Sequence, residues 1–104
     1  MEKIVKQGLL YDFYGALLND HQRSIYELVV YDNMSLSEIA SEQGISRQGV
    51  HDLIKRCDKS LEEYENKLHL VERFMAIKDD VEIIETKAES AEIKAIAAKI
   101  LEQL

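Results

Sequence analysis

The sequence predicts an all-α protein, in which a helical domain with a helix-turn-helix is followed by a C-terminal helical extension. Apolar residues recur three and four positions apart along almost the whole chain, as they do on one face of a helix. Proline is absent and only four glycines occur in 104 residues, so there are few signals for strands or turns. The run Leu36–Ile54 also has the spacing of a helix-turn-helix.

Two helices are expected before this run. The first extends from about Glu2 to Leu17, and the second, capped by Asn19 or Asp20, extends roughly from His21 to Tyr31. The residues expected to face the core are Ile4, Leu10, Tyr11, Tyr14, Leu17, Leu18, Ile25, Leu28 and Val29. Tyrosines at this helical spacing, without interleaved basic residues, indicate core packing rather than stacking on bases.

The helix-turn-helix itself carries several independent local signals. Ser35 with Glu38 forms a capping box for its first helix, and Ser46 is the N-cap of its second. Ala40 is small where the two helices cross, and Gly44 lies where the turn needs a positive φ. The apolar residues expected to share the small core are Ile39, Ile45, Val50 and Leu53.

After Ser46 we expect one long helix that continues to Asp79-Asp80, followed by a final helix from Val81 to Leu104. A stripe with a seven-residue period runs through the first part and predicts a short coiled-coil-like segment: Leu61, Tyr64, Leu68, Val71 and Met75. The predicted organisation is therefore a helix-turn-helix domain over residues 1–60 and a helical extension over residues 61–104. Because the extension has more apolar surface than a free helix exposes, it packs either on the first domain or in a homodimer.

Charge restricts the function classes that fit the chain. Thirteen Lys and Arg against twenty Asp and Glu give a net charge of −7, which argues against tight, unspecific binding of a polyanion. Residues 46–60 are different, because four basic residues there face only two acidic ones. The segment that contains the second helix of the motif is thus locally positive.

Catalysis and metal binding are not expected. Ser46, His51 and Asp52 are triad residue types, but adjacent His and Asp on a helix point in different directions. The three histidines share no zinc-ligand spacing with Cys57, and no glycine-rich phosphate loop occurs, so no cofactor is expected. A lone cysteine excludes an internal disulfide. With no apolar run of membrane-spanning length and no signal-peptide pattern, a cytoplasmic protein is expected.

The second helix of the motif supplies the candidate nucleic-acid site. Arg47 can pair with guanine through two hydrogen bonds, Gln48 can pair with adenine in the same way, and Lys55 can reach a phosphate. The complete predicted set is Ser46, Arg47, Gln48, His51, Lys55 and Arg56. The alternative is an ordinary solvated helix face on a scaffold used for protein contacts, and the acidic total keeps that alternative open.

Residues 18–60 resemble region four of bacterial sigma factors. The residues that carry the resemblance are Leu18-Asn19, Gln22-Arg23, Ile25-Tyr26-Glu27-Leu28, Leu36-Ser37-Glu38-Ile39-Ala40, Gly44-Ile45-Ser46-Arg47-Gln48-Gly49-Val50 and Lys55-Arg56. That resemblance implies recognition of DNA through the second helix of the motif.

The whole chain is similar to the YlxM family of helix-turn-helix proteins. The similarity is carried by Tyr11-Asp12-Phe13-Tyr14-Gly15-Ala16-Leu17-Leu18, by Ile45-Ser46-Arg47-Gln48-Gly49-Val50 and by Leu61-Glu62-Glu63-Tyr64-Glu65. It implies a non-enzymatic regulator in the signal recognition particle pathway that contacts DNA, the particle's RNA or its GTPase. Two alternatives stay open: a DNA-binding transcriptional regulator, and a protein-binding adaptor that uses the helical extension.

Overall fold

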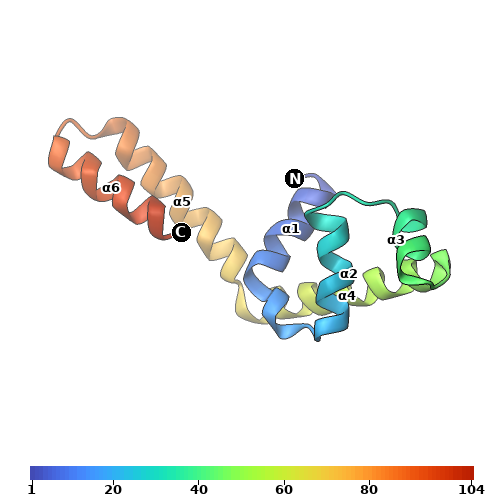
Figure 1. Cartoon of the computed structure of the whole chain (residues 1–104). Helices are drawn as coiled ribbons and strands as arrows, with labels where there is room; N and C mark the ends of the chain where they lie inside the picture. Colours follow the sequence, from blue (N-terminus) through green and yellow to red (C-terminus); the bar gives the residue numbers. More distant parts are fainter. The chain divides into compact units, whose positions relative to one another are not determined.

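The computed structural model describes all 104 residues and confirms an all-α fold, with six helices and no strand (Figure 1). The chain forms two compact units, residues 1–68 and residues 69–104. The first unit contains α1 (Lys3–Tyr14), a short 3-10 turn (Gly15–Leu17), α2 (Asp20–Val30), α3 (Leu36–Gln43) and α4 (Arg47–Leu68). The second unit contains α5 (Leu70–Lys87) and α6 (Ala91–Gln103).

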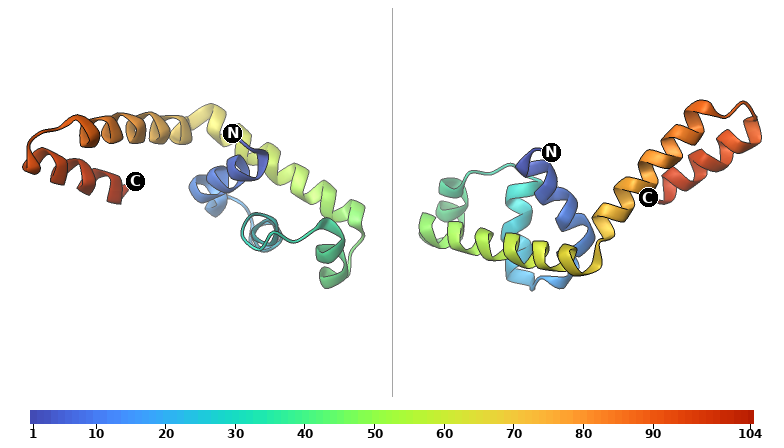
Figure 2. Two further views of the ribbon diagram at one scale, coloured as in Figure 1. Left: turned by 90° about the horizontal axis from the view of Figure 1, so that it is seen from above. Right: turned by 180° about the vertical axis from the view of Figure 1, so that it is seen from behind.

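The core of the first unit is built mainly from the face of α4 that packs against α1, α2 and α3. Val50, Ile54, Cys57 and Leu61 recur at helical spacing along α4 and are all buried. They meet buried side chains from the other three helices: Leu10, Tyr11, Tyr14, Ile25, Tyr26 and Ile39. The view from above shows α3 beside the first turns of α4 (Figure 2). This arrangement fixes α4 along the buried stripe and leaves its opposite side in solvent.

Five of the nine predicted core residues of the first two helices are buried, and Leu28 and Val29 are half-buried. Ile4 and Leu17 are exposed, because Ile4 lies in the first turn of α1 and Leu17 lies in the 3-10 turn that ends it. A 3-10 turn rotates the chain by more per residue than an α-helix does, so the apolar stripe predicted for a continuous α-helix does not extend through it.

The C-terminal half of α4 belongs to the first unit, whose boundary lies after Leu68 rather than after residue 60. Leu61 is fully buried, and the hydroxyl of Tyr14 in α1 donates a 2.6 Å hydrogen bond to the carboxylate of Glu65 in α4. These contacts extend the packing of α4 beyond the helix-turn-helix motif.

Two helix boundaries in the extension differ from the sequence predictions. The expected uninterrupted helix up to Asp79-Asp80 is wrong, because His69 is left-handed (φ 55°) and separates α4 from α5. Histidine enters this conformation more readily than most residues. Both aspartates lie inside α5 and remain exposed, so their charges stay hydrated and their modest helix propensity is tolerated.

The second difference is a turn at Ala88–Ser90, where a continuous final helix from Val81 was expected. Ser90 accepts a hydrogen bond from the backbone N–H of Ile93 (3.3 Å) and is the N-cap of α6. A serine that can bond to backbone groups in this way favours a helix start over a helix interior.

α5 and α6 lie side by side and run antiparallel, joined by the Ala88–Ser90 turn (Figures 1 and 2). Val81 of α5 and Ala97 of α6 are buried where the two helices meet. The predicted coiled-coil stripe is interrupted at His69, and its members Leu68 and Met75 are exposed. None of the helices combines the length and the apolar character that crossing a membrane requires.

Candidate nucleic-acid interface

The helix-turn-helix is formed by α3, a short turn and α4. Ser35 and Glu38 form the predicted capping box, in which the Glu38 N–H donates to Ser35 Oγ and the Ser35 N–H donates to Glu38 Oε1. Gly44 adopts φ 69°, and the N–H groups of Gly44 and Ile45 both donate to the carbonyl of Ala40. The left-handed conformation of Gly44 thus lets the turn supply hydrogen-bond donors to a carbonyl group in the last turn of α3.

The start of α4 is also as predicted. The backbone N–H of Gly49 donates a 2.9 Å hydrogen bond to Ser46 Oγ, which makes Ser46 the N-cap of this helix. The Ser46 hydroxyl oxygen is therefore already engaged by its own helix. Any contact that Ser46 makes to a ligand must use the hydroxyl proton or the backbone.

The small core between α3 and α4 differs from prediction at one position. Ile39 and Val50 are fully buried and Leu53 is half-buried, whereas Ile45 is 41% exposed. Ile45 stands between the left-handed Gly44 and the cap Ser46, outside both helices. Neither apolar stripe therefore includes it.

Most of the predicted site residues lie in solvent on the early turns of α4. Ser46, Arg47, Gln48, Lys55 and Arg56 are exposed, and His51 is half-buried. The exposed side of the helix also carries Asp52. The side-chain amide of Gln48 donates a 2.9 Å hydrogen bond to Asp52 one turn later. Gln48 must leave this carboxylate before its amide can pair with a base.

His51 and Lys55 lie along one edge of α4, where they border a groove toward the other helices. The groove has a volume of about 320 Å³ and is also lined by Lys3 of α1, Val29 of α2 and Leu36 of α3, among others. His51 Nδ1 is buried and lies 3.6 Å from the nearest Asp52 carboxylate oxygen, too far for a hydrogen bond. His51 thus lies against the body of the unit more than the sequence pattern suggested.

The neighbouring part of this groove is lined by residues of α1, which the helix-turn-helix motif in the sequence did not predict to lie near α4. Lys3 and Lys6 of α1 line a hollow of about 240 Å³ together with Lys55. Lys6 forms a 3.1 Å ion pair with Glu62 of α4. Because these lysines stand about fifty positions before Lys55 in the sequence, no local spacing could have indicated that they lie beside it.

An anchored carboxylate lies below these lysines. Asp58 Oδ1 accepts hydrogen bonds from the side-chain amide of Gln7 (2.9 Å) and from the hydroxyl of Tyr26 (2.6 Å). Burial, and secondarily this hydrogen bond to Asp58, raises the pKa of Tyr26 well above its ordinary value. These hydrogen bonds link α1 and α2 to α4. They hold α4 in a fixed position against the other two helices.

Cys57 is fully buried next to this network. Burial raises the pKa of its thiol to about 11, with a smaller contribution from the charge of Asp58. A thiol that holds its proton in this way is a packing group and a poor nucleophile. In addition, nowhere in the chain do three or more His, Cys, Asp or Glu side chains come together as a possible metal site.

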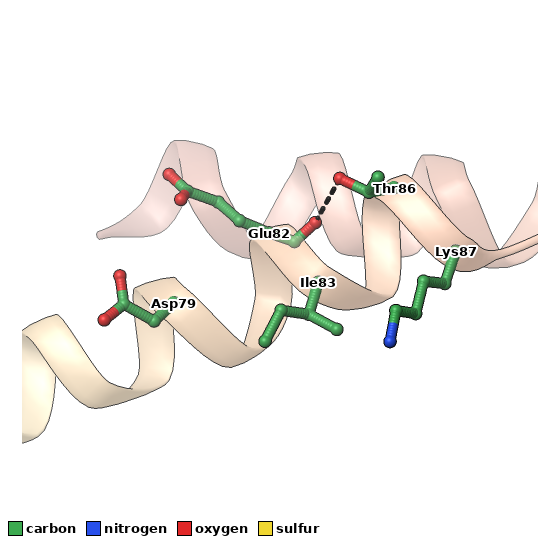
Figure 3. Close-up of a pocket in the computed structure, with 5 residues that line it drawn as sticks. All are labelled: Asp79, Glu82, Ile83, Thr86 and Lys87. Atoms are coloured by element: carbon green, nitrogen blue, oxygen red, sulfur yellow. Dashed lines mark hydrogen bonds between the residues drawn. The ribbon is translucent and has the colours of Figure 1, made fainter.

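A hollow of about 480 Å³ lies on the second unit, lined by Asp79, Glu82, Ile83, Thr86 and Lys87 (Figure 3). All five residues belong to α5, and the Thr86 hydroxyl donates to the backbone carbonyl of Glu82. This is the open side of one helix, without the convergent walls of a ligand site.

Comparison with known proteins gives a consistent result. Residues 1–101 match the model of the UPF0122 family, described as "Putative helix-turn-helix protein, YlxM / p13 like". A UPF0122 protein of Thermoanaerobacter sp. (strain X514) is 45% identical over 103 residues, covering 92% of this chain and 88% of the relative. A UPF0122 protein of Streptococcus gordonii is 45% identical over 87 residues, covering 84% of this chain and 79% of that relative.

Proposed function

The chain belongs to this UPF0122 family of YlxM/p13-like helix-turn-helix proteins, and we propose that it is a regulatory, non-enzymatic protein that binds nucleic acid through α4. The observation that carries the proposal is the exposure of Arg47, Lys55 and Arg56 on the second helix of a fully capped helix-turn-helix. In this motif the second helix lies in the major groove, with its N-terminal residues at the base edges.

Each exposed side chain has a defined role in the proposal. Arg47 stands in the first turn of α4 and reads a base edge, and Lys55 and Arg56 lie farther along the helix and contact phosphates. Gln48 exchanges its bond to Asp52 for a base. Lys3, across the groove from Lys55, adds positive charge beside the same phosphates.

The net negative charge of the first unit lowers the affinity expected for nucleic acid. Residues 1–68 carry eight Lys and Arg against twelve Asp and Glu, so long-range attraction to a polyanion is weak. We therefore propose that two copies bind together, because a dimer places two reading helices on two half-sites and roughly combines their contacts. The protein acts in the cytoplasm in this proposal.

The family resemblance supports a finer proposal about the target. We propose that the protein takes part in the signal recognition particle pathway, through the particle's RNA or its GTPase. A pull-down with the intact chain, followed by identification of bound RNA, DNA and protein, tests this. Recovery of neither the particle's RNA nor its GTPase would exclude that target and would leave binding through α4 to be decided separately.

Binding through α4 is tested by the salt dependence of affinity. Wild-type chain is titrated with a pool of random-sequence duplex DNA and with a pool of RNA hairpins, at several salt concentrations. If Lys55 contacts a phosphate, Lys55→Ala weakens binding and reduces the slope of log K against log salt by about one. Arg47→Ala should weaken binding to the sequences that the wild-type chain binds best in these pools by about 1–3 kcal/mol. It should also relax the base preference.

Lys67→Ala is the matched control. Lys67 is an exposed lysine in the last turn of the same helix, far from the turn that enters a groove. Its removal should leave the slope unchanged. If Arg47→Ala and Lys55→Ala bind both pools as tightly as wild type, or lose no more than Lys67→Ala loses, the proposed interface is refuted.

A further inference from the structure

The hairpin of α5 and α6 has one strongly apolar side. Five isoleucines there are between 38% and 53% exposed, and we call them the isoleucine face: Ile77, Ile84, Ile93, Ile96 and Ile100. Isolated exposed apolar residues are normal on a protein surface, but a contiguous group of this size marks an interaction surface.

Helix geometry places these isoleucines together. Ile77 and Ile84 are four residues before and three after the buried Val81, and Ile93 and Ile100 are four before and three after the buried Ala97. At about 100° per residue, both pairs are turned by the same angle, in the same sense, from the line where the helices meet. Because the helices run antiparallel, equal turns of this kind bring both pairs to the same side of the hairpin.

The opposite side of the hairpin carries charged side chains together with the half-buried Leu101 and the exposed Met75. Lys78 and Glu85 are three before and four after Val81, and Lys94 is three before Ala97, so these side chains turn the other way. The hairpin is thus amphipathic across its width, with one side suited to water and the other suited to burial. Packing of α5 against α6 alone does not cover the isoleucines.

We propose that the isoleucine face binds the same face of a second copy of this chain, so that two hairpins form a four-helix bundle. The area is sufficient. α5 and α6 have 18 and 13 residues, and with helices about 10 Å wide each copy offers on the order of 500 Å². Two such faces together reach the ~1,000 Å² that a specific interface needs.

The charges beside the face select the orientation of the second copy. Lys87 lies about 9 Å along α5 beyond Val81, and Glu92 lies about 8 Å along α6 from Ala97, toward the same end of the hairpin. If the two-fold axis runs along the helices, α5 faces the second copy's α6, and Lys87 of each copy lies opposite Glu92 of the other.

The other face-to-face orientation is unfavourable. With the two-fold axis across the helices, α5 faces the second copy's α5, so that Asp80 meets Asp80 and Arg73 meets Lys87. Like charges that face each other across an interface repel. Charge complementarity therefore favours the axis along the helices and makes Lys87 and Glu92 partners between copies.

Sedimentation of the full-length chain tests the apolar part of this interface. Wild type should be a dimer at micromolar concentration, and Ile84→Lys should raise the dissociation constant at least tenfold. Ile83→Lys is the matched control, since Ile83 is equally exposed but lies on the outer side of α5, beside Asp79 and Thr86 (Figure 3). It should leave the dimer intact, and circular dichroism checks that both variants stay helical.

Charge reversal tests the orientation. Lys87→Glu places two glutamates opposite each other between copies, and Glu92→Lys places two lysines there, so each variant alone should dimerise about tenfold more weakly. An equimolar mixture of the two restores both opposite-charge pairs and should form a heterodimer as tight as wild type. Recovery on mixing cannot arise from an effect within one chain.

Three results overturn the proposal: a monomeric wild type, equal effects of Ile83→Lys and Ile84→Lys, or no recovery on mixing the charge variants. None of these measurements involves nucleic acid, so this proposal and the α4 interface can fail independently.

Discussion

At the residue scale, two glycines with similar sequence surroundings have different structural roles. A Cβ built on Gly8 in α1 would meet no atom within 4 Å, so this position only weakens the helix. A Cβ on Gly15 would lie 2.7 Å from the ring of Tyr11, which is buried. Gly15 is therefore required by packing, and only the structure distinguishes the two.

Substitution by alanine should separate these roles. Gly8→Ala should raise the free energy of unfolding by about 0.5–1 kcal/mol, because alanine is the better helix former. Gly15→Ala should lower it by about 1–3 kcal/mol, because the Tyr11 ring must move within a packed core. Urea unfolding measures both. If the two substitutions change stability in the same direction by similar amounts, the assigned role of Gly15 is wrong.

The buried thiol of Cys57 predicts a dependence of stability on pH. Its pKa in the folded chain is about 11, above the ordinary value of 9.0, so the folded state holds this proton more tightly than the unfolded state does. The associated stabilisation is complete below pH 9 and is lost as pH rises through 11. Between these values it should decrease by about 2 kcal/mol.

Cys57→Ala provides the comparison. Urea unfolding at pH 8, 9, 10 and 11 should show a smaller decrease for the variant than for wild type, since tyrosines and lysines titrate in both. Identical pH profiles would show that the thiol is not held protonated by burial.

At the scale of elements, the helix starts in the first unit follow local chemistry. The capping boxes at Asn19 with Gln22 and at Ser35 with Glu38 are both complete. These bonds join residues three positions apart and need no tertiary partner, which is why the sequence predicted a cap at both places.

Ser35→Ala should therefore lower the free energy of unfolding by about 1 kcal/mol, since it leaves the Glu38 N–H without its acceptor. Ser37→Ala is the control, because Ser37 is an exposed serine inside α3 and makes no cap. Alanine there should be neutral or slightly stabilising. Equal losses at the two serines, measured by urea unfolding, would contradict the capping argument.

The helix breaks at His69 and at Ala88–Ser90 depend on more than the local pattern. Neither contains a glycine or a proline, so the sequence offered no strong stop signal. The aspartates at 79 and 80 looked like an interruption but lie exposed within α5. Helix propensity differences of a few tenths of a kcal/mol are too small to determine such boundaries.

At the scale of the whole chain, charge is distributed unevenly with respect to the proposed functions. Both units are acidic, while the exposed early turns of α4 carry Arg47, Lys55 and Arg56. The proposed interface is thus a small positive area on a negative protein, which favours contacts that depend on fit over contacts that depend on charge alone. Pairing of two hairpins would double that area without raising the positive charge of either copy.

The sequence indicated part of the candidate site. Arg47, Gln48, Lys55 and Arg56 could be placed because the Gly44 and Ser46 signals fix where α4 begins, and 100° per residue then fixes its exposed side. The half-burial of His51, the bond from Gln48 to Asp52 and the nearness of Lys3 could not be placed in this way. Each depends on how side chains or distant helices settle against one another.

By itself, the sequence determined the all-α class, the helix-turn-helix and its caps, since these depend on backbone bonds and apolar periods within a few residues. The tertiary structure alone decided that Gly15 must be small, that Gln7 and Tyr26 converge on Asp58, and that α5 folds against α6 with its isoleucines left on one side. The physical reason is that local preferences differ by less than 1 kcal/mol, whereas burial of side chains from helices far apart in the sequence contributes several.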